Sequence, residues 1–159
     1  MGGWRVSNDS YTSSLTSNPL NIEKLKIGDN DYNNNSVTKL KLSGLVQLKW
    51  IVIGDKCFGK VRVFELNELN ELESVVIGEK SFTHAKEDWD IWNRERSDGS
   101  CGIVNCPKLK SIQIGDRSFS DYHSFELNSL LSLQSIDIGN RCFFSAPSFS
   151  LTGLIDGLV

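Results

Sequence analysis

Cysteine and histidine are the side chains in this sequence best suited to nucleophilic or metal chemistry, but their spacing favours neither. The two histidines, His84 and His123, have no nucleophile motif such as GxSxG near them, and the chain has no phosphate-binding glycine loop. The cysteines match neither a zinc-binding pattern nor a CxxC redox motif; they are Cys57, Cys101, Cys106 and Cys142. The sequence therefore predicts a protein that is not an enzyme and that has no metal and no cofactor.

Charged residues recur at a regular interval, and they suggest a second kind of chemistry. An acid is followed by a base at Asp55-Lys56, Glu79-Lys80 and Asp116-Arg117, and Asp29 occupies the equivalent place before Asn30. If successive copies stack, these pairs form a row of carboxylates beside a row of cations. Two interpretations stay open at this point, a polar binding stripe or a solvated edge in which opposite charges offset like-charge crowding.

Each pair follows a glycine, and these glycines mark a repeat that covers most of the 159 residues. They are separated by 26, 24, 37 and 24 residues, and they are Gly28, Gly54, Gly78, Gly115 and Gly139. A fixed period of this size is typical of a solenoid. We number each turn so that this glycine stands at repeat position 7. Large apolar residues, or cysteine, then fill positions 1, 4, 6, 11, 17, 19 and 22 in every complete turn.

The apolar positions 4 and 6 alternate with polar neighbours, and so do positions 17 and 19. This period of two is typical of half-buried strands. The sequence therefore predicts a mainly β solenoid of about five 24-residue turns, with two short parallel strands per turn. The glycine at position 7 is expected to let the backbone turn. Cys101 and Cys106 fill positions 17 and 22 of the degenerate copy "CGIVNCPKL" and are predicted to be core residues.

The predicted organisation is an N-terminal cap segment over residues 1–21 and a solenoid over residues 22–159, with an insertion at 83–100. Cys57 and Cys142 both occupy position 10, three turns apart, at a spacing of about 14 Å that is too long for a disulfide. Cys101 and Cys106 lie too far apart on an extended segment to pair. Unpaired cysteines and the lack of a signal-peptide pattern lean towards a cytoplasmic setting.

The repeat resembles leucine-rich repeats, and the closer likeness is to their BspA-like branch. The residues that carry the resemblance are "LKSIQIGDRSF" and "LQSIDIGNRCF", and they recur in equivalent form over residues 22 to 154. The asparagine expected at position 9 appears only as Asn30, because the later turns have Lys56, Lys80, Arg117 and Arg141. The resemblance implies a recognition scaffold without catalysis.

Three regions could bind a partner. Trp50, Val52 and Val76 are predicted to form an apolar patch on the first strands, unless residues 1–20 cover it. Trp89 and Trp92 lie in the insertion, where they could contact a partner or pack against the solenoid. The chain ends at "LTGLIDGLV" without a polar capping turn, so that either Ile155, Leu158 and Val159 form a lid or the open end self-associates.

The leading functional hypothesis is a non-catalytic protein-interaction scaffold. The alternatives are a surface adhesin or glycan-binding fragment of a larger repeat protein, an enzyme, and a purely structural piece of a longer array. A net charge of −3 gives no reason to expect nucleic acid or an anionic membrane as a partner. A protein partner is therefore expected, and the sequence does not identify it.

Overall fold

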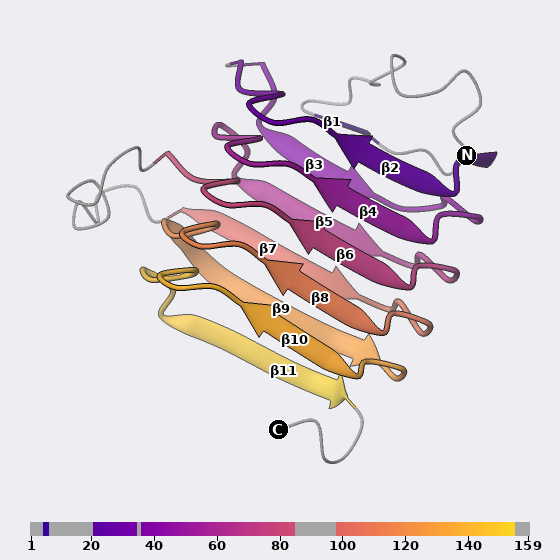
Figure 1. Cartoon of the computed structure of the whole chain (residues 1–159). Coiled ribbons are helices and arrows are strands. Elements are labelled where there is room, and N and C mark those ends of the chain that lie inside the picture. Colours follow the sequence, from indigo (N-terminus) through magenta and orange to yellow (C-terminus); the bar gives the residue numbers. More distant parts are fainter. Residues whose placement is uncertain (1–4, 7–20, 35, 85–97, 155–159) are drawn as a thin grey trace.

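The computed structural model describes residues 5–6, 21–34, 36–84 and 98–154, which fold into two stacked sheets joined by turns (Figure 1). Sheet A has six strands in the order β1 (Arg5–Val6), β3 (Lys39–Leu42), β5 (Val63–Asn67), β7 (Gly99–Val104), β9 (Tyr122–Leu130) and β11 (Ser148–Leu154). Sheet B has five strands in the order β10 (Ser135–Ile138), β8 (Ser111–Ile114), β6 (Ser74–Ile77), β4 (Trp50–Ile53) and β2 (Lys24–Ile27).

The predicted fold class is confirmed. Each turn contributes one strand to each sheet, and every strand from β2 to β11 pairs in parallel with the equivalent strand of the next turn. Repeat position 6 stays in register throughout, because Ile27 pairs with Ile53, and Ile77 pairs with both Ile53 and Ile114. The chain is therefore a β-solenoid.

The core consists of the predicted apolar columns, which lie between the two sheets. The rings at position 11 form a continuous stack, with centroids 5.1, 5.0, 4.6 and 5.1 Å apart. The members of this stack are Tyr32, Phe58, Phe82, Phe119 and Phe143. Cys101 and Cys106 are buried in the core, as predicted, and all four cysteines are free thiols. Each turn buries its apolar side chains mainly against its neighbours, which is why solenoid turns fold together.

The glycine column has a different cause from the one expected. The φ angles of the position 7 glycines are not positive; positive φ angles occur at positions 9 and 11 instead, as at Lys56 (56°) and Phe58 (55°). A Cβ atom on Gly78 would lie 2.6 Å from the carbonyl carbon of Gly54, in the turn before. Gly28, in the first turn, has nothing within 4 Å of such an atom. The four later glycines are therefore needed for close stacking and not for turning the backbone.

Three of the four acids that follow a repeat glycine bond to the backbone of the next turn. Asp29 Oδ1 accepts a hydrogen bond from the Asp55 N–H at 2.9 Å, and Asp55 Oδ1 accepts one from the Glu79 N–H at 2.8 Å. Asp116 Oδ1 accepts one from the Asn140 N–H at 2.8 Å. The predicted row of acids exists, and these three carboxylates also satisfy backbone donors, a role that neither of the two interpretations from the sequence included.

Position 10 forms a ladder of small hydrogen-bond donors inside the solenoid. The Oγ atom of Ser81 donates to the Gly54 carbonyl at 2.8 Å, and the Sγ atom of Cys57 donates to the Gly28 carbonyl at 2.9 Å. Ser118 and Cys142 bond in the same way to the glycine carbonyl of the preceding turn. The predicted separation of Cys57 and Cys142 in different turns is correct, and the structure adds that both thiols belong to this ladder.

Tyr122 fills the place where the insertion interrupts the repeat. Its ring packs on Gly99, whose Cβ atom, if present, would lie 2.6 Å from the ring. Arg62 lies over the same ring at 5.2 Å and forms an ion pair with Asp121 at 3.2 Å. Residues 85–97 of the insertion lie outside the described residues. His123 is exposed in strand β9, because β9 begins at Tyr122.

At the N-terminal end, β1 pairs in an antiparallel direction with β3, so that Arg5 is opposite Lys41. Residues 5–6 of the predicted cap segment therefore lie at the edge of sheet A. Its other residues up to 20, and residues 155–159 of the predicted lid, lie outside the described residues.

Candidate functional site

The predicted apolar patch is assembled on the outer face of sheet B. Trp50 and Val52 alternate along β4, and Val76 on β6 is the register partner of Val52. Trp50 is 39% exposed, and both valines are half-buried. An indole on a flat face beside two small aliphatic side chains is the kind of anchor that protein interfaces use. We call these three residues the Trp50 patch.

Charge surrounds the Trp50 patch asymmetrically. Lys24 and Lys26 on β2 are the register partners of Trp50 and Val52. On the other side, Gln113 on β8 is the partner of Val76. The ammonium group of Lys49 also lies 5.7 Å from the Trp50 ring centroid. The patch is therefore apolar at its centre and basic on its N-terminal side, which favours a partner surface with an apolar centre and acidic neighbours.

The other two predicted contact residues, Trp89 and Trp92, lie in the part of the insertion outside the described residues. Their role therefore remains a prediction. Of the predicted binding residues, the structure brings together Trp50, Val52 and Val76.

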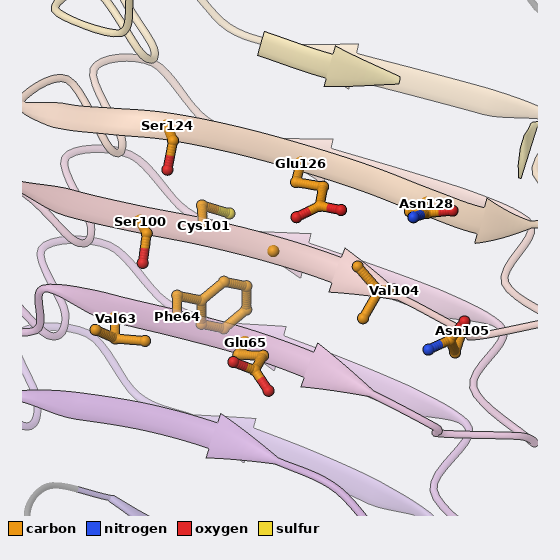
Figure 2. A pocket seen from close by; sticks show the side chains of 11 residues that line it. Val63, Phe64, Glu65, Ser100, Cys101, Val104, Asn105, Ser124, Glu126 and Asn128 are labelled. Carbon is orange, nitrogen blue, oxygen red and sulfur yellow. The ribbon is translucent and has the colours of Figure 1, made fainter. Parts of the chain in front are cut away.

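A second feature, which sequence reasoning missed, lies on the outer face of sheet A. Glu65, Gly102 and Glu126 are register partners on three neighbouring strands, β5, β7 and β9. Because glycine has no side chain, a shallow hollow of about 370 Å³ forms between the two glutamates (Figure 2). Polar groups dominate its rim, namely Ser100, Ser124, Asn105, Asn128 and the two carboxylates. We call this feature the Gly102 hollow.

The two carboxylates at the Gly102 hollow differ in their partners. Glu65 forms an ion pair with Lys41 at 3.1 Å. Glu126 forms no ion pair within the described part of the chain. The two Cα atoms stand two strands apart, about 9.6 Å at ordinary sheet spacing. The hollow can therefore accept hydrogen bonds from hydroxyl, ammonium or guanidinium groups.

The signal for the hollow was present in the sequence at repeat position 18. That position holds Lys41, Glu65, Gly102 and Glu126 in successive turns, so one small residue interrupts a row of long charged ones. In the degenerate copy "CGIVNCPKL", Gly102 lies between the core residues Cys101 and Ile103, so alternation along the strand places it on the outer face.

The four cysteine thiols are buried or half-buried. Burial raises the pKa of the Cys106 and Cys142 thiols to about 11, and it raises the pKa of Cys101 well above the ordinary thiol value. Burial is also the main reason why the pKa of the Cys57 thiol is raised. A thiolate is the reactive form of cysteine, so these thiols are weak nucleophiles near neutral pH. Among the described residues, no three His, Cys, Asp or Glu side chains are grouped to hold a metal ion.

The fold defines this chain as a β-solenoid protein. A scan against models of known protein families gives no match, and searches of curated proteins and of solved structures give none either. In the ranges that the structure describes, no helix is both long enough and apolar enough to cross a bilayer. The residues themselves are therefore the basis for any proposal about function.

Proposed function

We propose that this chain is a non-catalytic protein-interaction scaffold of leucine-rich repeat type, related to the BspA-like branch. The observation that carries the proposal is the Trp50 patch, where an exposed indole and two valines lie in register on a sheet. Backbone pairing on both sides of β4 and β6 holds these side chains before any partner arrives. Little ordering entropy is then lost on binding, which favours affinity.

The partner on this proposal is a protein surface with an apolar centre and acidic groups opposite Lys24 and Lys26. Partners can be selected by displaying a peptide or protein-domain library against the purified chain. For a selected ligand, Trp50→Ala is expected to weaken binding by about 2 kcal/mol or more, close to thirtyfold. Val76→Asp should weaken it too, since it places an acid beside the indole.

The matched control for these variants is Val46→Ala. Val46 is an apolar residue that is 59% exposed and lies outside the Trp50 patch, so its truncation removes a similar kind of surface. The proposal fails if selected ligands lose no affinity with Trp50→Ala, or lose as much with Val46→Ala. Circular dichroism of each variant verifies that the fold is retained.

The Gly102 hollow favours a second candidate function, glycan binding, as in a surface adhesin. Its rim offers hydroxyl, amide and carboxylate groups, which are the partners that sugar hydroxyls require. Gly102→Leu should fill the hollow without strain, because a Cβ atom there has nothing within 4 Å. A glycan array probed with the wild type and with this variant tests the idea, and binding that survives the filled hollow would count against it.

A further inference from the structure

The two ends of the solenoid differ in how their core columns terminate. At the N-terminal end, Leu40 and Leu42 of β3 are each 1% exposed, and β1 pairs along the outer edge of that strand. At the C-terminal end, Phe149 of β11 is 55% exposed and Leu151 is 45% exposed. The same two columns are at most 2% exposed in every other turn. Within the described residues, the two core columns are therefore buried at the N-terminal end and exposed at the C-terminal end.

From Ser148 to Thr152, before the positive φ angle at Gly153, strand β11 has none of the features that usually protect an edge strand. It pairs with β9 on one side, and no described strand pairs with its other side. Its seven residues, "SFSLTGL", include no charged residue and no proline. Natural edge strands are commonly short, or they carry lysine, proline or a bulge, because unprotected edges pair with other chains. This strand is long, uncharged and apolar on its core side.

We propose that a second copy of this chain covers the open end, in a tail-to-tail dimer with two-fold symmetry. A head-to-tail contact would need the N-terminal edge of sheet A, where β1 already pairs with Leu40 and Lys41 of β3. A two-fold axis uses the same end of both copies, and it makes β11 run antiparallel to its symmetry mate. Sheet A would then continue across the dimer, and β10, the edge strand of sheet B at the same end, would lie against its own mate.

The sequence of β11 is self-complementary in this arrangement. If the axis passes at Ser150, Phe149 lies opposite Leu151 of the second copy on the core side, and the reverse pair completes the contact. On the outer side, Ser148 lies opposite Thr152 of the second copy, and the two Ser150 side chains face each other. No charges of the same sign meet along the strand. This inference concerns the end of the solenoid and does not depend on the proposed function of its faces.

Introducing a charge at Ser150, on the proposed axis, tests the dimer. Sedimentation velocity of the wild-type chain across a wide concentration range should show a monomer–dimer equilibrium. Ser150→Lys and Ser150→Glu should each weaken the dimer by about tenfold or more, because like charges then face each other across the axis. An equimolar mixture of the two variants should restore the dimer. Gln113→Lys, an exposed change of the same charge on β8, is the matched control and should leave the equilibrium unchanged.

Each alternative result overturns the proposal. A wild-type chain that stays monomeric means that this end does not pair, and species that grow steadily with concentration mean head-to-tail contacts. Failure of the mixture to dimerise places the contact elsewhere. If the charged variants lose their strand signal in circular dichroism, Ser150→Cys decides the question. Mild oxidation should link residue 150 of both copies by a disulfide, identified by peptide mapping, and absence of that link contradicts the two-fold axis.

Discussion

The hydroxyl group of Tyr122 donates a hydrogen bond of 2.6 Å to the carbonyl oxygen of Val61, which lies two turns earlier in the solenoid. The side chain therefore spans the third turn, where the inserted residues leave the repeat. Both groups are buried, and the aromatic ring also contacts Phe119 edge-on at 4.9 Å. This single side chain links three successive turns at the site where the regular stacking is interrupted.

Tyr122→Phe should lower the free energy of unfolding by about 1–2 kcal/mol, because it leaves the Val61 carbonyl buried without its donor. Tyr122→Ala should be more damaging, by about 3–5 kcal/mol, since the ring is lost as well. Urea denaturation of the two variants measures the difference. Equal stability of the wild type and Tyr122→Phe would show that the hydrogen bond contributes nothing.

The glycine column gives a prediction with a control inside the same column. Gly78→Ala should destabilise the chain by about 1–3 kcal/mol or more, because its Cβ atom would collide with the backbone of the preceding turn. Gly28→Ala should have little effect, since that space is empty. Thermal unfolding of the pair tests whether stacking or backbone turning requires glycine, and equal losses would favour the turning explanation.

The ladder at position 10 predicts that serine and cysteine are interchangeable and that alanine is not. Ser118 Oγ donates to the Gly78 carbonyl at 2.6 Å and accepts from the Ser81 N–H at 3.0 Å. Ser118→Ala should therefore cost about 1–3 kcal/mol. Ser118→Cys should cost clearly less, because cysteine already occupies this position in two other turns. If the cysteine and alanine variants unfold at the same urea concentration, the ladder bond has no role in stability.

The buried thiols predict a loss of stability at alkaline pH. Folding raises the pKa of Cys106 and Cys142 from 9.0 to about 11. Between these values the unfolded chain holds fewer protons than the folded chain, so the free energy of unfolding falls as pH rises from about 9 to about 11. Below pH 9 both states are protonated and these groups leave stability unchanged.

Cys142→Ser is the matched variant for the alkaline loss. It retains a donor for the Gly115 carbonyl but removes one titrating thiol. The fall in stability should then be shallower, by at most about 1.4 kcal/mol per pH unit. Urea midpoints measured across this pH range for both chains check the prediction, and parallel curves would mean that the Cys142 thiol titrates normally.

The apolar columns were predicted from the sequence because their packing depends mainly on the same repeat position in the adjacent turns. A residue such as Ile114 packs against the same repeat position in the turns before and after it, so a period of 24 residues is enough to place it. The two strands per turn, the buried Cys101 and Cys106, and the shared face of Trp50, Val52 and Val76 all follow from that period and from alternation along each strand.

Tertiary structure decided the features that depend on backbone atoms in the next turn. Asp29 and Ser81 looked like ordinary polar residues, but their partners are N–H and carbonyl groups that reach them only after stacking. The hydrogen bond between Tyr122 and Val61 could not be predicted, because the insertion in the third turn interrupts the repeat between these two residues. The Gly102 hollow forms because Gly102 has no side chain, whereas its register partners on the two neighbouring strands are glutamates. Periodicity specifies which residues face the core, whereas three-dimensional stacking decides what each polar group bonds to.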